Sequence, residues 1–202
     1  MHVDLQGDRT SGETDHGIPK DGPGADLKRI LFTAQAIQAK VEELSREIVR
    51  DYRGQQVLMV GVLNGCFPFM SDLIRNMSVH LEVDFMSVSS YGGGSRSSGI
   101  VRILKDLNVN IEGRHVMLVE DIVDTGLTAR YLMDNLRTRR PASVELCVLL
   151  DKREARAEEV PIKYVGFECP NEFVVGYGLD YHQLYRNLPY IGVLRNEVSD
   201  RT

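Results

Sequence analysis

The chain has 202 residues and a formal net charge of -5, with 43% of its residues hydrophobic and 26% charged. These are ordinary values for a globular domain, and a chain of this length can bury a core without disulfides or a structural metal. The acidic balance argues against nucleic acid or an anionic membrane as the main partner. A small anionic substrate is still compatible with it, because local backbone dipoles can hold one.

The three cysteines are far apart in the sequence. Their odd number and wide spacing predict free thiols in a reducing compartment, and neither a disulfide framework nor a Cys-x-x-Cys zinc site. No apolar run reaches the roughly 18 residues of a membrane span. The acidic N-terminal residues also lack the apolar stretch of a signal peptide. We therefore expect a cytoplasmic protein.

The first 26 residues are rich in Gly, Asp and Pro and show no apolar period, which predicts a disordered tail. Thr33 then provides a helix N-cap, with Phe32 and Ile37 placed as a hydrophobic staple. Apolar residues recur on one helical face as far as Ile48, so a helix is predicted over Ala34–Arg50.

Short apolar runs alternate with helical or loop segments along the rest of the chain. Strands are predicted at Val57–Leu63, Val83–Val88, His115–Glu120, Val144–Leu150 and Ile162–Phe167, and helices at Pro68–Asn76 and Thr128–Thr138. The Gly- and Ser-rich stretch Tyr91–Gly99 is predicted to be a long flexible loop. Apolar strands separated by helices indicate βαβ units, and therefore a single α/β domain over residues 27–202 with a mainly parallel sheet.

The segment E-D-I-V-D-T-G-L-T, from Glu120 to Thr128, links the third predicted strand to a helix. Gly126 allows a tight turn, so the amides of Asp124–Thr128, the threonine hydroxyls and the helix N-terminus can together bind a phosphate. Glu120 and Asp121 suit ribose hydroxyls or a hydrated Mg2+. The alternative is an ordinary α/β loop with acidic capping residues.

The order of apolar strand, E-D, two apolar residues, D-T-G-x-T and helix resembles the signature of the type I phosphoribosyltransferases. This resemblance implies a mainly parallel twisted sheet flanked by helices and a small hood formed from the chain ends. It also implies phosphoribosyl pyrophosphate as the donor, with the 5'-phosphate on Asp124, Thr125, Gly126, Leu127 and Thr128. The similarity to the hypoxanthine-guanine branch runs from about Leu31 to Arg195.

Three further segments match parts of that branch that surround the donor. Leu63, Asn64 and Gly65 resemble the pyrophosphate-binding loop, where the family has Lys or Arg in place of Asn64. Because the family's contact there is largely through backbone, we expect function to be retained. Ser90 and Tyr91 resemble the base of a mobile flap, and Arg186 resembles the pyrophosphate-binding arginine. A simple turn and a disordered hairpin remain the alternatives for the first two segments.

The purine side of the site is implied by two other matches. Lys152 follows an apolar strand and corresponds to the family's donor to the purine 6-oxo oxygen; a surface salt bridge is the alternative. Within F-V-V-G-Y-G-L-D-Y, Phe173 would stack on the base and Val174 would offer backbone groups to its edge. Asp180, also beside the purine, would bind Mg2+ together with Glu120 and Asp121.

The resemblance implies transfer of 5-phosphoribosyl to N9 of hypoxanthine or guanine, giving IMP or GMP and pyrophosphate, in a homodimer or homotetramer. Asp124 is predicted to be the general base that takes a proton from the purine. Two alternatives stay open. One is a xanthine-preferring enzyme of the same family, and the other is a non-catalytic nucleotide-sensing regulator on the same fold, such as one that binds RNA.

Overall fold

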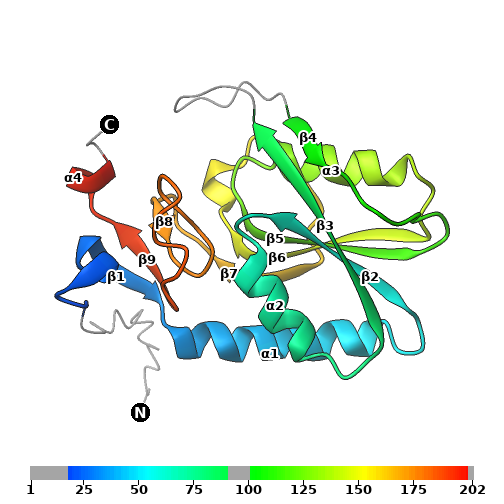
Figure 1. The fold of residues 1–202 in the computed structure, drawn as a ribbon, viewed down its shortest axis with the longest axis horizontal. Helices are drawn as coiled ribbons and strands as arrows, with labels where there is room; N and C mark the ends of the chain where they lie inside the picture. The colour runs from blue at the N-terminus through cyan, green and yellow to red at the C-terminus, as the bar shows by residue number, and fades with distance from the viewer. Residues whose placement is uncertain (1–17, 91–100, 200–202) are drawn as a thin grey trace, which may run out of the picture.

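Two β-sheets organise the protein, a large one at the centre and a small one at one end (Figure 1). The computed structural model describes residues 18–90 and 101–199. No helix within these ranges is long and apolar enough to cross a membrane.

The large sheet has six strands in the order β4-β3-β2-β5-β6-β7. Its strands are β2 (Val57–Leu63), β3 (Leu81–Ser90), β4 (Val101–Lys105), β5 (His115–Val123), β6 (Ser143–Asp151) and β7 (Tyr164–Glu168). All neighbours pair in parallel except β4, which runs antiparallel to β3 at the edge. The predicted α/β class with a mainly parallel sheet is confirmed.

Helices cover both faces of this sheet. The helices α1 (Ala34–Asp51) and α2 (Phe67–Arg75) lie on one face, and α3 (Leu127–Arg137) lies on the other (Figure 1). Alternate strand residues point to opposite sides, so Met117 packs toward α1 and α2 while Leu118 packs toward α3. This burial on both sides explains why the strands read as continuous apolar runs.

The helix α1 begins where its capping residue predicts. The Oγ1 atom of Thr33 accepts a hydrogen bond from the Ala36 amide at 3.2 Å. The buried apolar face of the helix runs from Ile37 to Ile48, as the periodicity predicts. The hydroxyl of Ser45, on the same face, donates to the Leu73 carbonyl of α2 at 2.9 Å and joins the two helices.

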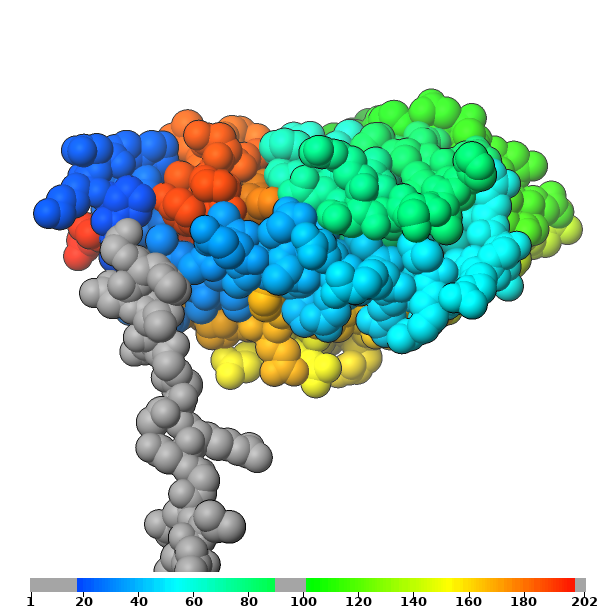
Figure 2. Space-filling view, turned by 90° about the horizontal axis from the view of Figure 1, so that it is seen from below, coloured from blue at the N-terminus to red at the C-terminus, as the bar shows by residue number. Residues whose placement is uncertain are grey.

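The small sheet joins segments from both ends of the chain and stands where the resemblance puts the hood. It contains β1 (Leu27–Phe32), β9 (Ile191–Leu194) and β8 (Val174–Val175), with β9 in the middle and every pair antiparallel. The 3-10 helix η1 (Gly22–Asp26) precedes it and the short helix α4 (Asn196–Ser199) follows it. Figure 2 shows these segments, in blue, orange and red, gathered beside one end of α1.

Two boundaries differ from those expected from sequence. The described chain is already ordered over η1, in the last part of the predicted tail, because the Tyr185 hydroxyl donates to Asp26 Oδ2 at 2.8 Å and Gly24 is buried. The strand β5 runs on to Val123, so Glu120 and Asp121 lie within it rather than at its end, and β6 pairing holds it extended. The predicted loop Tyr91–Gly99 lies outside the described residues.

Candidate active site

Three segments that the sequence singles out meet at one edge of the large sheet. They follow β2, β5 and β6, which are neighbours and end at Leu63, Val123 and Asp151. The chain order along the sheet reverses between β2 and β5, and parallel α/β sheets bind ligands at such a switch point. The predicted pyrophosphate loop, phosphate turn and purine lysine are therefore brought to one edge.

The phosphate turn, residues Asp124–Thr128, connects β5 to α3. Gly126 has a φ of 84°, and a Cβ placed on it would lie 2.3 Å from the Glu158 carbonyl oxygen. Glycine is therefore required both by the left-handed backbone and by the close approach. Within the described residues, nothing accepts a hydrogen bond from the amides of Asp124, Thr125 or Gly126. Free amides beside a helix N-terminus form a site for an anion.

Of the two acids of β5, Glu120 is buried and Asp121 is half-buried. Glu120 is 6% exposed, and its Oε1 has no hydrogen-bond partner within the described residues. Burial raises the pKa of Glu120 well above its usual range, and the charge of Asp121 adds to the shift. Burial also raises the pKa of Asp121 to about 6. An orphaned, buried carboxylate oxygen indicates a position where a ligand donates a hydrogen bond.

The segment after β2 packs between Asp121 and the hood. The Leu63–Asn64 peptide bond is cis. A Cβ on Gly65 would lie 1.7 Å from Asp121 Oδ2, and a Cβ on Gly178 would lie 2.0 Å from the Gly65 carbonyl oxygen. The loop thus contacts both Asp121 and the segment that the resemblance assigns to the purine.

Asp180 and Arg186 contact one another directly. The Nη2 atom of Arg186 lies 2.7 Å from Asp180 Oδ1, and its Nη1 donates to the Gly178 carbonyl at 2.6 Å. The second oxygen of Asp180 accepts from the Gln183 amide at 2.8 Å. Over the described ranges, no three acidic, His or Cys side chains gather closely enough to hold a metal by themselves.

Lys152 reaches toward the phosphate turn. Its Nζ lies 3.6 Å from Asp124 Oδ2, and its side chain is 10% exposed while that of Asp124 is 48% exposed. The pair is therefore a salt bridge between a nearly buried ammonium group and a half-exposed carboxylate. The residue predicted to hold the purine oxygen and the predicted general base therefore lie side by side.

Phe173 and Val174 stand at the beginning of β8. Phe173 is 48% exposed and meets the Tyr181 ring edge-on, with centroids 5.5 Å apart. Phe173 is therefore not a core residue, and its ring is accessible for stacking. Val174 is buried and pairs with Val193 of β9. Ser90 ends β3 and pairs with Val101, whereas Tyr91 lies outside the described residues.

The sequence did not indicate two residues behind the phosphate turn. Asp151, the last residue of β6, is 3% exposed and forms an ion pair with Arg156, whose guanidinium also donates to the carbonyls of Val123 and Asp124. One signal was present in the sequence. An acidic residue closing an apolar strand needs a cation when it is buried.

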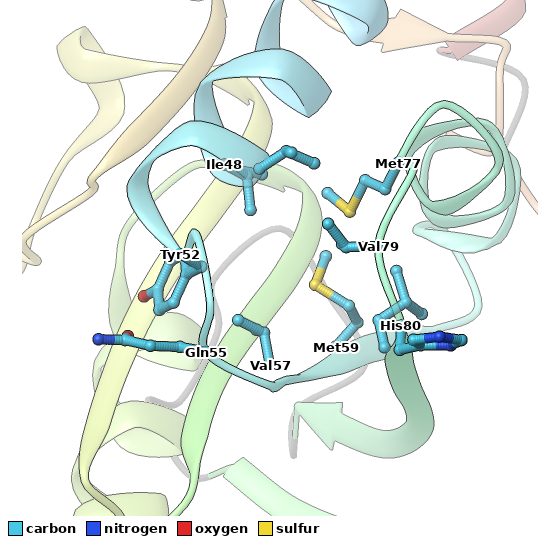
Figure 3. A pocket seen from close by; sticks show the side chains of 10 residues that line it. Ile48, Tyr52, Gln55, Val57, Met59, Met77, Val79 and His80 are labelled. Atoms are coloured by element: carbon cyan, nitrogen blue, oxygen red, sulfur yellow. The ribbon is translucent and has the colours of Figure 1, made fainter.

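Elsewhere the described surface has a narrow apolar crevice under the end of α1 (Figure 3). Side chains of α1, β2, β3 and the segment before β3 line it, among them Ile48, Tyr52, Met59 and His80. It lies beside the amino ends of β2 and β3, the opposite edge from the phosphate turn. Its lining offers no carboxylate or cation, so the crevice is a gap in the core packing rather than a second active site.

Comparison with known proteins agrees with this geometry. The family model for the phosphoribosyl transferase domain matches residues 29–182. The hypoxanthine-guanine phosphoribosyltransferase of Streptococcus thermophilus is 50% identical over 176 residues, covering 87% of this chain and 98% of that protein. The bifunctional protein TilS/HprT of Listeria monocytogenes is 52% identical over 173 residues, but the chain spans only 27% of its length.

A solved structure gives the same assignment. The hypoxanthine phosphoribosyltransferase of Staphylococcus aureus superposes with a TM-score of 0.83 at 49% identity, covering 86% of this chain and 95% of that one. The chain therefore belongs to the phosphoribosyltransferase family, and within it to the hypoxanthine-guanine phosphoribosyltransferases.

Proposed function

We propose that this protein transfers the 5-phosphoribosyl group of phosphoribosyl pyrophosphate to N9 of hypoxanthine or guanine, in purine salvage. The observation that carries the proposal is the contact between Lys152 and Asp124 at 3.6 Å. It sets a hydrogen-bond donor for a 6-oxopurine beside a carboxylate on the phosphate turn. Asp124 thus belongs both to the proposed phosphoribosyl site and to the proposed purine site. The two substrates would therefore lie next to one another, as a transfer between them requires.

The donor would lie along the carboxyl edge of the sheet. Its 5'-phosphate would accept from the free amides of the phosphate turn, and its ribose hydroxyls would donate to Glu120 and Asp121. Its pyrophosphate would meet Leu63, Asn64 and Gly65. Once the Arg186 side chain leaves Asp180, its guanidinium offers two parallel hydrogen-bond donors for the same anion.

Carboxylate oxygens of Asp180, Glu120 and Asp121 suit Mg2+, which takes few protein ligands and is completed by phosphate oxygens and water. The Oε1 atom of Glu120, which has no hydrogen-bond partner within the described residues, fits such a shared site. Bound Mg2+ would neutralise charge on the departing pyrophosphate. The protein's own part is to hold the ribose and both anions in line.

In the reaction, the bond from the ribose anomeric carbon to pyrophosphate breaks and a bond to purine N9 forms. Lys152 donates to the 6-oxo oxygen, Phe173 stacks on the base, and Val174 offers backbone groups to its edge. The purine loses a proton as N9 attacks, and Asp124 accepts it. Ser90 and Tyr91 belong to the flap that would exclude water from the ribosyl cation.

The direct test incubates the protein and Mg2+ with phosphoribosyl pyrophosphate and hypoxanthine, guanine or xanthine in separate reactions. We expect release of pyrophosphate and formation of IMP or GMP with the first two bases. Turnover with xanthine alone would instead identify a xanthine-preferring enzyme. No pyrophosphate release with any base would favour a nucleotide-sensing regulator.

The general base is tested with Asp124→Asn. We expect kcat to fall at least about 100-fold, because the variant loses its proton acceptor, while the affinity for the donor changes little. Asp134→Asn is the matched control, since Asp134 is 51% exposed on α3 and pairs only with arginines. Wild-type kcat in Asp124→Asn would overturn the assignment.

The resemblance also implies a homodimer or homotetramer in the cytoplasm. All three cysteines are free and buried, as expected of reduced thiols that take no part in the chemistry. Light scattering on the purified protein measures the assembly directly.

A further inference from the structure

The phosphate turn is tied from behind by the segment that follows β6, which includes the short 3-10 helix η2 (Arg153–Ala155). The amides of Ala157 and Glu158 both donate to the Thr125 carbonyl at 2.9 Å. The Lys152 amide donates to the Val123 carbonyl at 3.0 Å. This segment therefore binds carbonyl groups on both sides of Asp124.

Arg156 supplies the remaining contacts. Its Nε donates to the Asp124 carbonyl at 3.1 Å, and its Nη2 donates to the Val123 carbonyl at 3.3 Å. The same Nη2 forms an ion pair with Asp151 Oδ1, and the two side chains are 10% and 3% exposed. A buried guanidinium that bonds a carboxylate and two carbonyls is fixed in position, because its planar fork leaves little freedom.

Carbonyl contacts on one side of the turn orient amides on the other. In a planar trans peptide, the carbonyl of one residue and the N–H of the next point in opposite directions. Tying the carbonyls of Val123, Asp124 and Thr125 therefore turns the amides of Asp124, Thr125 and Gly126 away from Arg156. Among the described residues, no group accepts a hydrogen bond from these three amides.

We propose that Arg156 is a positioning residue, which acts with Asp151 to hold the phosphate turn in the orientation that binds the 5'-phosphate of the donor. Arg156 acts through the backbone and does not itself touch the substrate. The inference rests on the proposed function, because it assigns the donor phosphate to this turn. The proposal predicts that loss of the Arg156 guanidinium weakens binding of the donor far more than binding of the purine.

Arg153 provides a matched control within the same segment. Its Nε lies 3.0 Å from Asp151 Oδ2, so it pairs with the same carboxylate as Arg156. Its side chain is 71% exposed, and its ion pairs are with Asp151 and Glu168 rather than with the turn. Replacing it removes a charge beside Asp151 and leaves the carbonyl contacts of Arg156 in place.

The test compares Arg156→Met, Arg156→Lys and Arg153→Met in steady-state kinetics with both substrates varied. For Arg156→Met we expect the KM for phosphoribosyl pyrophosphate to rise about tenfold, as loss of one or two hydrogen bonds allows, with a much smaller change in the KM for hypoxanthine. Arg156→Lys should fall between this variant and wild type. Free guanidinium ion should partly restore Arg156→Met, and Arg153→Met should match wild type.

Binding of ribose 5-phosphate, measured by calorimetry, separates this inference from the proposed function because it needs no turnover. If wild type binds it and Arg156→Lys binds it more weakly than Arg153→Met does, the positioning role holds even without transferase activity. Should Arg156→Met fail to fold, the comparison of Arg156→Lys with Arg153→Met decides the question. Equal donor affinity in those two variants, or equal rises in both KM values, would overturn the proposal.

Discussion

At Gly65 a single hydrogen in place of a side chain allows the pyrophosphate loop to rest on Asp121. A Cβ there would lie 1.7 Å from the Oδ2 atom of that carboxylate. The far end of a carboxylate can move, but the half-buried carboxylate of Asp121 accepts hydrogen bonds from the backbone at Asp121 and Ile122. Any side chain at Gly65 must therefore displace either the loop or an acid that the ribose is proposed to contact.

Gly65→Ala is expected to lower kcat/KM by about tenfold or more, because a shift of a few tenths of an ångström in a positioning group is costly. Steady-state kinetics with the donor varied would measure it. Gly54→Ala serves as the control. A Cβ at Gly54 meets open space, but its φ of 78° should cost roughly 1–2 kcal/mol in the free energy of unfolding without changing kcat/KM. Wild-type kinetics in Gly65→Ala would contradict the role of this contact.

At this scale the sequence predicts a role where one residue type has a distinctive chemical use. It points to Asp124 and Lys152 separately, and in the structure the two side chains lie in contact. Arg156 was missed because an arginine after a strand is common on surfaces. Its function depends on which carbonyls lie within reach, and neither periodicity nor spacing encodes that.

Among the elements, β5 is the strand in which folding shifts the pKa values of two adjacent acids. It places two adjacent acids, Glu120 and Asp121, in the interior of a parallel sheet. Their removal from water favours the protonated forms. In the folded protein each acid therefore holds its proton at a pH where the unfolded chain has already lost it.

This strand predicts a pH dependence of stability. The pKa of Asp121 rises from 3.8 to about 6 on folding, so its contribution to stability is present at low pH and is lost as the pH rises from about 4 through 6. At 1.36 kcal/mol per pKa unit, the gain in unfolding free energy from Asp121→Asn should be about 2 kcal/mol larger at pH 7.5 than at pH 4.5. Denaturant titrations without substrates at both pH values would test this. The same gain at both pH values would refute it.

The elements divide into those that sequence alone could predict and those that need a distant partner. The strands β2, β5 and β6 contain runs of apolar residues because both faces of the sheet are covered, and the helices carry a clear apolar face. The sequence does not predict the strands β1, β4, β8 and β9. Each is short or only half-buried, and β1 becomes a strand through pairing with β9 at the other end of the chain.

On the scale of the whole molecule, the site lies between two sheets of different size. One face of the small sheet packs on the main core through Ile191 and Val193 of β9. Its other face covers a small cluster of five buried residues, among them Leu27 and Leu194. The loops proposed to bind the donor are thus carried by the large sheet, together with Lys152, whereas Phe173 and Val174, also proposed to contact the purine, belong to the small one.

This division predicts two levels of protection in amide hydrogen exchange. Amides of β2, β5 and β6 should exchange only through global unfolding, whereas those of β9 should exchange faster through local opening of a three-stranded sheet with a small cluster. Mass spectrometry of the free protein would resolve the two groups. Addition of GMP should slow exchange in β8 and β9 more than in β4. Equal protection of β9 and β5 without ligand would contradict the prediction.

The pairing of β1 with β9 also has a consequence for the order in which parts of the protein fold during synthesis. The Tyr185–Asp26 hydrogen bond beside this pair joins residues 159 positions apart, and β9 is the last described strand to leave the ribosome. A nascent chain can assemble the carboxyl edge of the large sheet before β9 is available. At that stage neither β1 nor β8 has the strand with which it pairs. We therefore expect the growing polypeptide to form its phosphate turn first, and the segment of Phe173 and Val174, proposed to contact the base, only when β9 emerges.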